Sequence, residues 1–130
     1  MYGSGWNNEL GLSYKGPLSG YHVAVHDACA PTKYNGLIDY KYSICIENCS
    51  ILNYFSEKIT DAMLCWSIPI YYGCKNISEF FPEGSFYEID INDPIKCVKQ
   101  IEEITTKPIT QRNIDALKKA RHLILNKYNI

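Results

Sequence analysis

The chain has 130 residues, of which 46% are hydrophobic and 21% charged, so it can bury a core and is expected to form one domain over residues 1–130. The formal net charge is −1 with mixed signs, which argues against an electrostatic nucleic-acid surface. No apolar run reaches the roughly 18–20 residues that a membrane span needs, and residues 1–11 carry no signal-peptide pattern. We therefore expect a soluble, cytoplasmic chain.

Six cysteines raise the question of disulfides and metal sites. None of them forms a C-x-x-C pair, and the three histidines lack zinc-ligand spacing to any cysteine pair, so we expect no metal site. Cys45, Cys65 and Cys97 fall within expected strands or helices beside apolar neighbours. We interpret them as buried, reduced thiols that pack like small hydrophobic side chains.

The first third of the chain shows few signals of regular structure. Residues 1–21 are rich in Gly, Asn, Tyr and Ser and are typical of a loop. A weak alternation predicts a short strand over residues 22–26, and residues 33–40 suggest a helical turn. The apolar run 42–46 predicts a buried strand whose carboxyl end opens on a polar loop.

An amphipathic helix is expected over residues 57–66, with Ser56 as its N-cap. Its apolar positions recur at helical spacing and are Ile59, Ala62, Met63 and Trp66. Residues 68–73 then predict a second strand, residues 76–81 a short helix or turn, and residues 85–91 a third strand.

Two further helices follow the third expected strand. Pro94 at a first helical position begins an amphipathic helix over residues 94–104, in which Ile95, Val98 and Ile101 are apolar. Thr110 is suited to cap a last helix. The apolar face of that helix is expected to carry Ile114, Leu117, Ile124 and Tyr128. Strands that alternate with helices predict an α/β fold with a parallel sheet.

The most informative stretch is the polar connection between the first strand and the first helix. In parallel α/β sheets, ligands lie beyond the carboxyl ends of the strands, where the next helices begin. Asn48 lies at such a strand end, and Glu57 and Lys58 lie at such a helix start. Free N–H groups at a helix start attract anions, and Lys58 would add a positive charge.

Two interpretations of this stretch remain open from the pattern alone. Glu57 could simply favour the helix dipole while Lys58 is a solvated charge, and helix-end electrostatics by themselves favour this interpretation. Alternatively, Lys58 neutralises the diphosphate of a nucleotide sugar, Glu57 and Asn48 bind sugar hydroxyls, and Tyr54 lines the site. Neither a Walker loop nor a G-x-G-x-x-G fingerprint is present, so kinase and Rossmann oxidoreductase functions lack their phosphate loops.

Three segments, in order and at matching spacing, resemble the carboxy-terminal domain of the α-1,3/α-1,4-fucosyltransferases, glycosyltransferase family 10. They are YKYSICIEN at 40–48, YFSEKITDA at 54–62 and IPIYYG at 68–73. Two positions depart from the family pattern, because Ile46 stands where Phe is usual and Tyr72 where Trp is common. Both departures preserve an apolar or aromatic character.

The resemblance implies a Rossmann-like parallel sheet flanked by helices, corresponding to the carboxy-terminal half of a GT-B glycosyltransferase. Members invert the configuration of fucose as they transfer it from GDP-fucose to a GlcNAc-containing glycan, with no metal cofactor required. By position, Asn48, Tyr54, Glu57 and Lys58 correspond to donor-binding residues of the family. The general base belongs to an amino-terminal domain, so no catalytic residue of this chain can be assigned.

Two alternatives stay open beside a fucosyltransferase donor domain. The chain could belong to a glycosyltransferase that uses another nucleotide sugar, or it could be a non-catalytic binding module or scaffold. The expected partners are a nucleotide sugar and, through a second domain, a glycan acceptor. If the full-length protein carries an anchor, a membrane-associated or Golgi location replaces the cytoplasmic one.

Overall fold

The structure, a computed structural model, describes residues 33–128. Residues 33–40 belong to one compact unit, Met1–Tyr40, and the remaining residues to a second, Lys41–Ile130. The described part of the first unit consists of consecutive turns, in which the N–H of Ile38 donates to the carbonyl of Tyr34 at 2.9 Å. This confirms the expected helical turn. The strand predicted over residues 22–26 lies outside the described residues.

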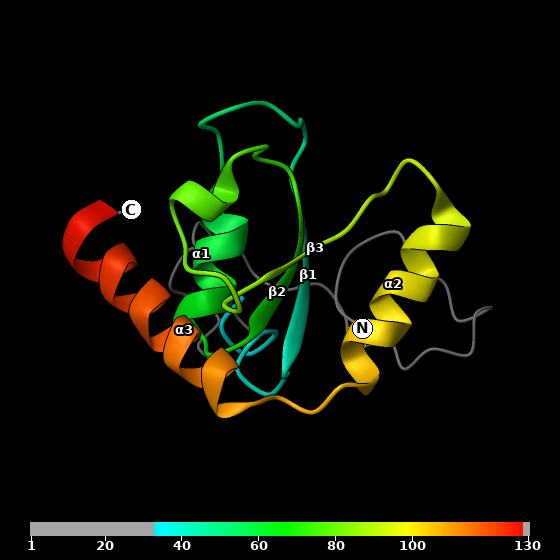
Figure 1. The fold of residues 1–130 in the computed structure, drawn as a ribbon. Coiled ribbons are helices and arrows are strands. Elements are labelled where there is room, and N and C mark those ends of the chain that lie inside the picture. The colour runs from blue at the N-terminus through cyan, green and yellow to red at the C-terminus, as the bar shows by residue number, and fades with distance from the viewer. Residues whose placement is uncertain (1–32, 129–130) are drawn as a thin grey trace, which may run out of the picture. The chain divides into compact units, whose positions relative to one another are not determined.

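The second unit is built on a parallel sheet of three strands in the order β1-β2-β3 (Figure 1). The strands are β1 (Tyr42–Ile46), β2 (Ile68–Tyr72) and β3 (Tyr87–Glu88). β1 pairs with β2 along its whole length, and β2 pairs with β3 through Ile70 and Tyr71. The predicted first two strands and the parallel α/β class are confirmed. The predicted burial of β1 is wrong, because Ile44 is 59% and Ile46 41% exposed and only Cys45 of this strand is buried.

The third strand is much shorter than the predicted range 85–91. Before it, Ser85 turns back, because both its N–H and its hydroxyl donate to the carbonyl of Pro82. After Ile89, the N–H of Asp90 donates to the side chain of Gln100 and not to a neighbouring strand. A turn before the strand and a side-chain contact after it therefore leave only two residues in the ladder.

Helices cover both faces of the sheet (Figure 1). On one face lie α1 (Glu57–Leu64) and α3 (Gln111–Leu123), which continues into a π-helical turn, Ile124–Tyr128. The larger core lies there and includes Ile59, Met63, Tyr71, Phe81 and Leu117. On the other face lies α2 (Pro94–Thr106), over a smaller core of Ile70, Ile89 and Ile104. Within residues 33–128, no helix is long and apolar enough to cross a membrane.

The first helix ends two residues earlier than predicted, and Trp66 is exposed outside it. Trp66 adopts a left-handed φ of 61° and donates its N–H to Met63, while the N–H of Ser67 donates to Ala62. These two bonds form a helix-terminating motif that usually carries glycine at the left-handed position. The chain therefore leaves the helix before Trp66 can join its apolar face.

The predicted apolar faces of α2 and α3 are also wrong in part. Ile95 and Val98 of α2 are 73% and 55% exposed, because this helix contacts the sheet mainly through Ile101 and Ile104 at its far end. In α3, Ile114 is exposed and Asn113 is buried instead. The Asn113 amide completes a capping box with Thr110 and donates to the Gly84 carbonyl at 2.9 Å and to the Tyr87 hydroxyl at 3.2 Å. Leu117 and Ile124 are buried as predicted.

The cysteine predictions can be compared with five described thiols. Cys45 and Cys65 are buried, as predicted, whereas Cys97 is only partly buried beside the smaller core. Cys74, for which no burial was predicted, is buried in the larger core. No disulfide joins any two of these five described cysteines.

Candidate functional site

The connection between β1 and α1 lies at the carboxyl end of the sheet, where it forms the uppermost loop in Figure 1. Ser56 caps α1 with its side chain, which accepts a hydrogen bond from the N–H of Lys58. The first N–H groups of any helix lack partners within the helix and point toward the space beyond its start. Anions bind at such positions in α/β folds, and the structure places the predicted segment there.

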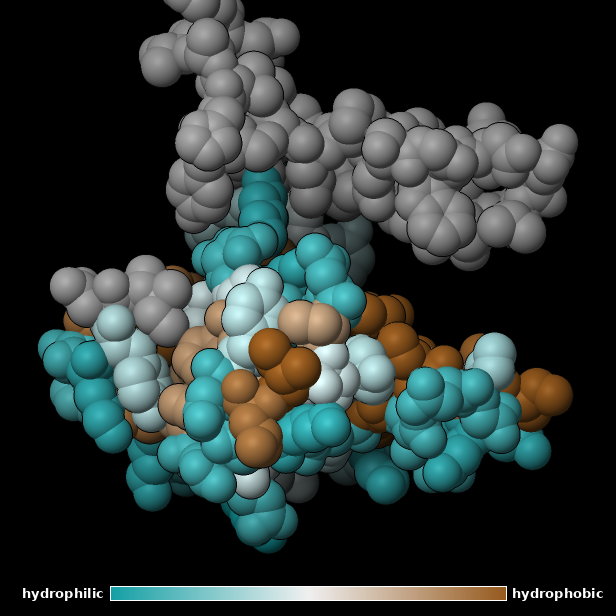
Figure 2. Space-filling view, turned by 90° about the horizontal axis from the view of Figure 1, so that it is seen from above, coloured by the Kyte–Doolittle hydropathy of each residue, from teal (hydrophilic) through white to brown (hydrophobic). Residues whose placement is uncertain are grey.

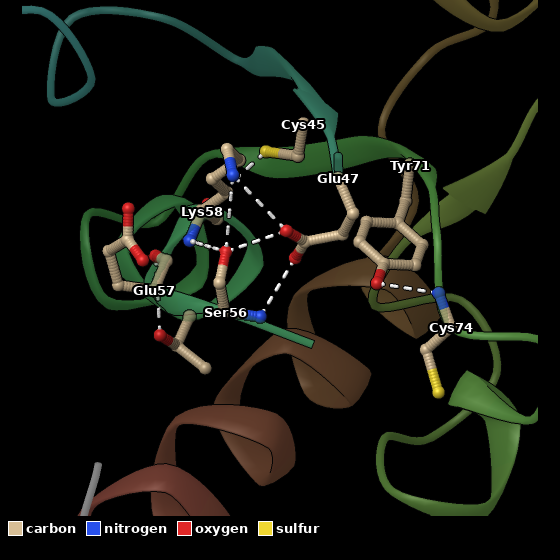
Figure 3. A network of polar contacts seen from close by, with 8 residues as sticks. Cys45, Glu47, Ser56, Glu57, Lys58, Tyr71 and Cys74 are labelled. Atoms are coloured by element: carbon tan, nitrogen blue, oxygen red, sulfur yellow. Dashed lines mark hydrogen bonds and ion pairs between the residues drawn. The ribbon is translucent and has the colours of Figure 1, made fainter. Parts of the chain in front are cut away.

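A buried carboxylate organises this helix start (Figure 3). Glu47 follows β1 directly, and its side chain is fully shielded from solvent. One carboxylate oxygen accepts from the N–H of Ser56 at 2.8 Å, and the other accepts from the Ser56 hydroxyl at 2.7 Å. The Lys58 ammonium lies 3.2 Å from that second oxygen and 3.5 Å from the Ser56 hydroxyl. Glu47, Ser56 and Lys58 thus form one charge-assisted network.

The third segment of the motif approaches the same carboxylate. A Cβ added to Gly73 would lie 2.4 Å from Cγ of Glu47 and 2.5 Å from the hydroxyl oxygen of Tyr71. That hydroxyl accepts a hydrogen bond from the N–H of Cys74 at 2.9 Å, and the Tyr71 ring is fully buried. Only glycine leaves room for both side chains, so the backbone that follows β2 packs directly against the Glu47 side chain.

Burial raises the pKa of the Tyr71 hydroxyl well above its ordinary value. The Glu47 carboxylate raises it further, since a second negative charge nearby would be unfavourable, while the bond from Cys74 acts in the opposite direction. Tyr71 is therefore neutral and buried, and it lies between the larger core and the Glu47 network. It can position Glu47 but cannot serve as a base at neutral pH.

The four predicted donor-binding residues all lie in the β1–α1 connection or in the first turn of α1. Lys58 is 34% exposed, so part of it faces solvent while its ammonium stays fixed. Asn48, Tyr54 and Glu57 are exposed, and Glu57 is directed away from the Glu47 carboxylate in Figure 3. The structure thus places these residues on one loop and helix start, and their individual roles stay predictions.

The loop is anchored to the segment after β2. The N–H of Asn53, which has a left-handed φ of 59°, donates to the Asn76 side chain at 2.9 Å, and the Asn76 amide donates back to Asn53 at 2.8 Å. In addition, the N–H of Lys75 donates to the Ile51 carbonyl. These contacts hold the exposed loop in one conformation without using its predicted ligand-binding side chains.

Figure 2 shows this edge of the sheet from above, with apolar side chains in the middle of a largely hydrophilic face. Ile51 and Leu52 are exposed apolar residues of the loop. A polar cleft of about 340 Å³ opens at the carboxyl ends of β2 and β3 and shares Tyr71 and Gly73 with the network. Its other lining residues are Ser50, Tyr72, Cys74, Lys75, Glu88, Ile89, Asp90 and Asn92.

A larger hollow of about 700 Å³ lies against α3 and is mostly apolar. It is lined by Pro82, Asp115, Lys118, Lys119, His122 and Leu123. None of these residues lies at a strand end, and none was predicted to bind a ligand. We therefore place the candidate site at the carboxyl end of β1 and not at this hollow.

Glu47 and Gly73 are the residues of this network that the sequence alone did not single out. A glutamate just after a strand was interpreted as part of a polar loop, although in the structure it is 3% exposed. The signal that could have found it is the pairing of two facts: Glu47 directly follows β1, and a glycine directly follows the parallel neighbour strand β2. Within residues 33–128, no group of three or more His, Cys, Asp or Glu side chains is arranged to hold a metal.

A parallel sheet of three strands with helices on both faces defines a Rossmann-like α/β domain. The family described as "Glycosyltransferase family 10 (fucosyltransferase) C-term" matches residues 14–110. This match covers more than half of the chain, so the chain belongs to that family. The predicted family is therefore confirmed.

Curated relatives agree with this assignment. An alpha-(1,4)-fucosyltransferase of Arabidopsis thaliana is 33% identical over 89 residues, which cover 65% of this chain and 22% of the relative. The alpha-(1,3)-fucosyltransferase FucT of Helicobacter pylori is 38% identical over 53 residues, which cover 41% of this chain and 11% of the relative. The chain thus matches less than a quarter of the length of either enzyme.

Solved structures are similar as well. A crystal structure of an alpha1,3-fucosyltransferase with GDP has a TM-score of 0.54 and 25% identity, and the match covers 88% of this chain and 32% of the other. A structure of an alpha1,3-fucosyltransferase with GDP-fucose has a TM-score of 0.53 and 25% identity, with coverage of 83% and 30%. These similarities confirm the predicted fold, that of the carboxy-terminal half of a GT-B glycosyltransferase.

Proposed function

We propose that residues 1–130 are the donor-binding domain of a longer two-domain fucosyltransferase. In this proposal the domain binds GDP-fucose, and the whole enzyme transfers fucose with inversion to a GlcNAc-containing glycan. Family membership supports the reaction class, and the complexes of similar enzymes with GDP and GDP-fucose support the donor. The acceptor and the stereochemistry are inferred from the family resemblance.

The observation that carries the proposal is the fixed ammonium of Lys58 at the start of α1. As the bond to fucose breaks, negative charge develops on the departing diphosphate. A unit positive charge about 4 Å from a unit negative charge contributes about 4 kcal/mol at an effective dielectric constant of about 20, and the nearby Glu47 carboxylate offsets part of this attraction. Because Lys58 is already held in place, little of this is lost in reorganising the site during the reaction.

The exposed polar side chains of the same connection would recognise the rest of the donor. Glu57 can accept hydrogen bonds from sugar hydroxyls while it favours the dipole of α1, and Asn48 can both donate and accept. Tyr54 offers a ring face and a hydroxyl at the edge of the site. In this proposal a residue outside the chain removes the acceptor proton, and Lys58 supplies charge that a metal would otherwise provide.

Titration calorimetry of the folded chain with GDP, UDP and ADP tests the proposal. We expect GDP to bind most tightly and GDP-fucose to bind the same site. Lys58→Ala should weaken GDP binding at least tenfold, because it removes a charge-assisted contact. Lys99→Ala, which removes an exposed lysine of α2, is the matched control and should leave binding unchanged.

Two results would count against the proposal. A folded chain that binds none of the three nucleotides is not a donor-binding domain. A clear preference for UDP or ADP over GDP would instead assign the domain to a glycosyltransferase with another donor. Circular dichroism on the same samples shows whether each variant is folded.

A further inference from the structure

We propose that Glu47 is a positioning residue of the donor site, which fixes the Lys58 ammonium where it can meet the diphosphate. This inference rests on the proposed function, because it assigns how the phosphate-binding charge is held. Glu47 itself is shielded from solvent and so cannot touch a ligand in this conformation. Its effect on binding must therefore pass through Ser56 and Lys58.

The first argument is that both oxygens of the Glu47 carboxylate accept hydrogen bonds from residues at the start of α1. Its two oxygens accept three hydrogen bonds, from the Ser56 N–H, the Ser56 hydroxyl and the Lys58 ammonium. A buried carboxylate is tolerated only when it is paired and hydrogen-bonded in this way. The arrangement is therefore fixed, and removing the charge of Glu47 would release the ammonium.

The second argument concerns the donors of Lys58. An ammonium has three N–H groups, and in the described part of the chain its acceptors are Glu47 and Ser56. One N–H thus remains for a ligand, and the partly exposed side chain leaves access for it. Holding the other two reduces the conformational entropy that a flexible lysine would lose on binding phosphate.

The third argument is that Glu47 has no room to adopt another position on the side of β2. Gly73 and the hydroxyl of Tyr71 lie directly against it. Tyr71 is in turn fixed by burial and by its bond from Cys74. All three segments that resemble the family thus meet at one carboxylate, which explains why a glycine follows β2 and a serine caps α1.

A competing physical effect makes the test decisive. The negative charge of Glu47 also offsets the positive charge of Lys58 and would by itself weaken attraction to phosphate. If charge compensation dominates, Glu47→Gln will strengthen GDP binding. If positioning dominates, as we infer, Glu47→Gln will weaken GDP binding about five- to tenfold, within the range for the net contribution of one typical hydrogen bond.

The experiment is a double-mutant cycle on the full chain, with calorimetry of GDP and of guanosine. Glu47→Gln should weaken GDP binding but leave guanosine binding unchanged, because guanosine has no phosphate. In a Lys58→Ala background, Glu47→Gln should add less than a twofold effect, since it acts through the missing lysine. The control is Glu83→Gln, the same substitution at an exposed ion pair with Arg112, which should change neither affinity.

Ser56→Ala serves as a second variant in case Glu47→Gln does not fold. It keeps both charges and removes the hydroxyl that joins them, and should weaken GDP binding two- to fivefold with no effect on guanosine. Equal losses for GDP and guanosine, or effects that multiply in the double variant, would show a merely structural role. Tighter GDP binding by Glu47→Gln would also overturn the inference.

A measurement without ligand separates this inference from the proposed function. Nuclear magnetic relaxation of the Lys58 ammonium in the free chain should show restricted motion. The ammonium should become more mobile in Glu47→Gln and stay equally restricted in Glu83→Gln. If the wild-type chain fails to bind GDP, the proposed function fails, and this relaxation difference still decides whether Glu47 holds Lys58. Unchanged relaxation in Glu47→Gln would refute the positioning role.

Discussion

Gly73→Ala is expected to destabilise the domain far more than an ordinary glycine substitution. The added Cβ would lie 2.4 Å from Cγ and 2.8 Å from Cβ of Glu47, and 2.5 Å from the hydroxyl oxygen of Tyr71. Neither neighbour can yield easily, because Glu47 is held by three hydrogen bonds and Tyr71 is fully buried. The methyl group must therefore displace the carboxylate from its network.

The magnitude follows from two contributions. Overpacking a well-filled site costs about 1–3 kcal/mol, and loss of a hydrogen bond to a charged group costs about 1.5–3 kcal/mol. We therefore expect about 3–5 kcal/mol loss in the free energy of unfolding, measured by urea denaturation. The same variant should weaken GDP binding, because it moves Glu47 away from Lys58.

Gly84→Ala provides the comparison. Gly84 has a φ of +91°, and an added Cβ would meet its neighbours only at ordinary contact distances of 3.6 and 3.7 Å. Backbone strain alone should cost about 1–2 kcal/mol there, without effect on GDP binding. If Gly73→Ala costs no more than Gly84→Ala and leaves GDP affinity intact, the close packing of Glu47 against Gly73 is refuted.

Two further predictions concern stability. The pKa of Tyr71 is raised in the folded state, so its contribution to the free energy of unfolding is present below about pH 10, the unfolded value, and is lost as pH rises above it. In urea unfolding, the free energy of unfolding of Tyr71→Phe should therefore fall less steeply than that of wild type between about pH 9 and about pH 11, and equal slopes would contradict this. The Arg121 guanidinium donates to the backbone carbonyls of Met63 and Leu64, the last two residues of α1, and lies 4.4 Å from the centre of the Trp66 ring. Arg121→Ala should therefore lower the free energy of unfolding by about 1–3 kcal/mol, and Arg121→Lys should recover less than half of this loss, whereas full recovery would show that charge alone matters.

Local signals in the sequence predicted the elements that hold the site. The apolar run of β1 and the capping residue Ser56 are short-range features, and both are confirmed in the structure. The rule that ligands bind beyond the carboxyl ends of parallel strands then leads to the candidate site, which stays a prediction. Strand pairing was not needed for this step, because each element carried its own signal.

Features that depend on contacts between distant residues could not be predicted in this way. The burial of Glu47 depends on Gly73, 26 positions later, and on a serine and a lysine of the next helix. The exposed position of Trp66 depends on a left-handed turn that pattern analysis expects at glycine. The short length of β3 depends on the side chain of Gln100, which lies in a later helix.

The central claim is that a nucleoside diphosphate binds at the start of α1 through Lys58. The most direct measurement is a GDP titration of the isotopically labelled chain, followed by nuclear magnetic resonance of its backbone amides. We predict that the largest shifts lie between Glu47 and Lys58 and after β2 around Gly73, and that Lys58→Ala abolishes them at the same GDP concentrations. Shifts concentrated at the hollow on α3, or a pattern unchanged by Lys58→Ala, would contradict the account.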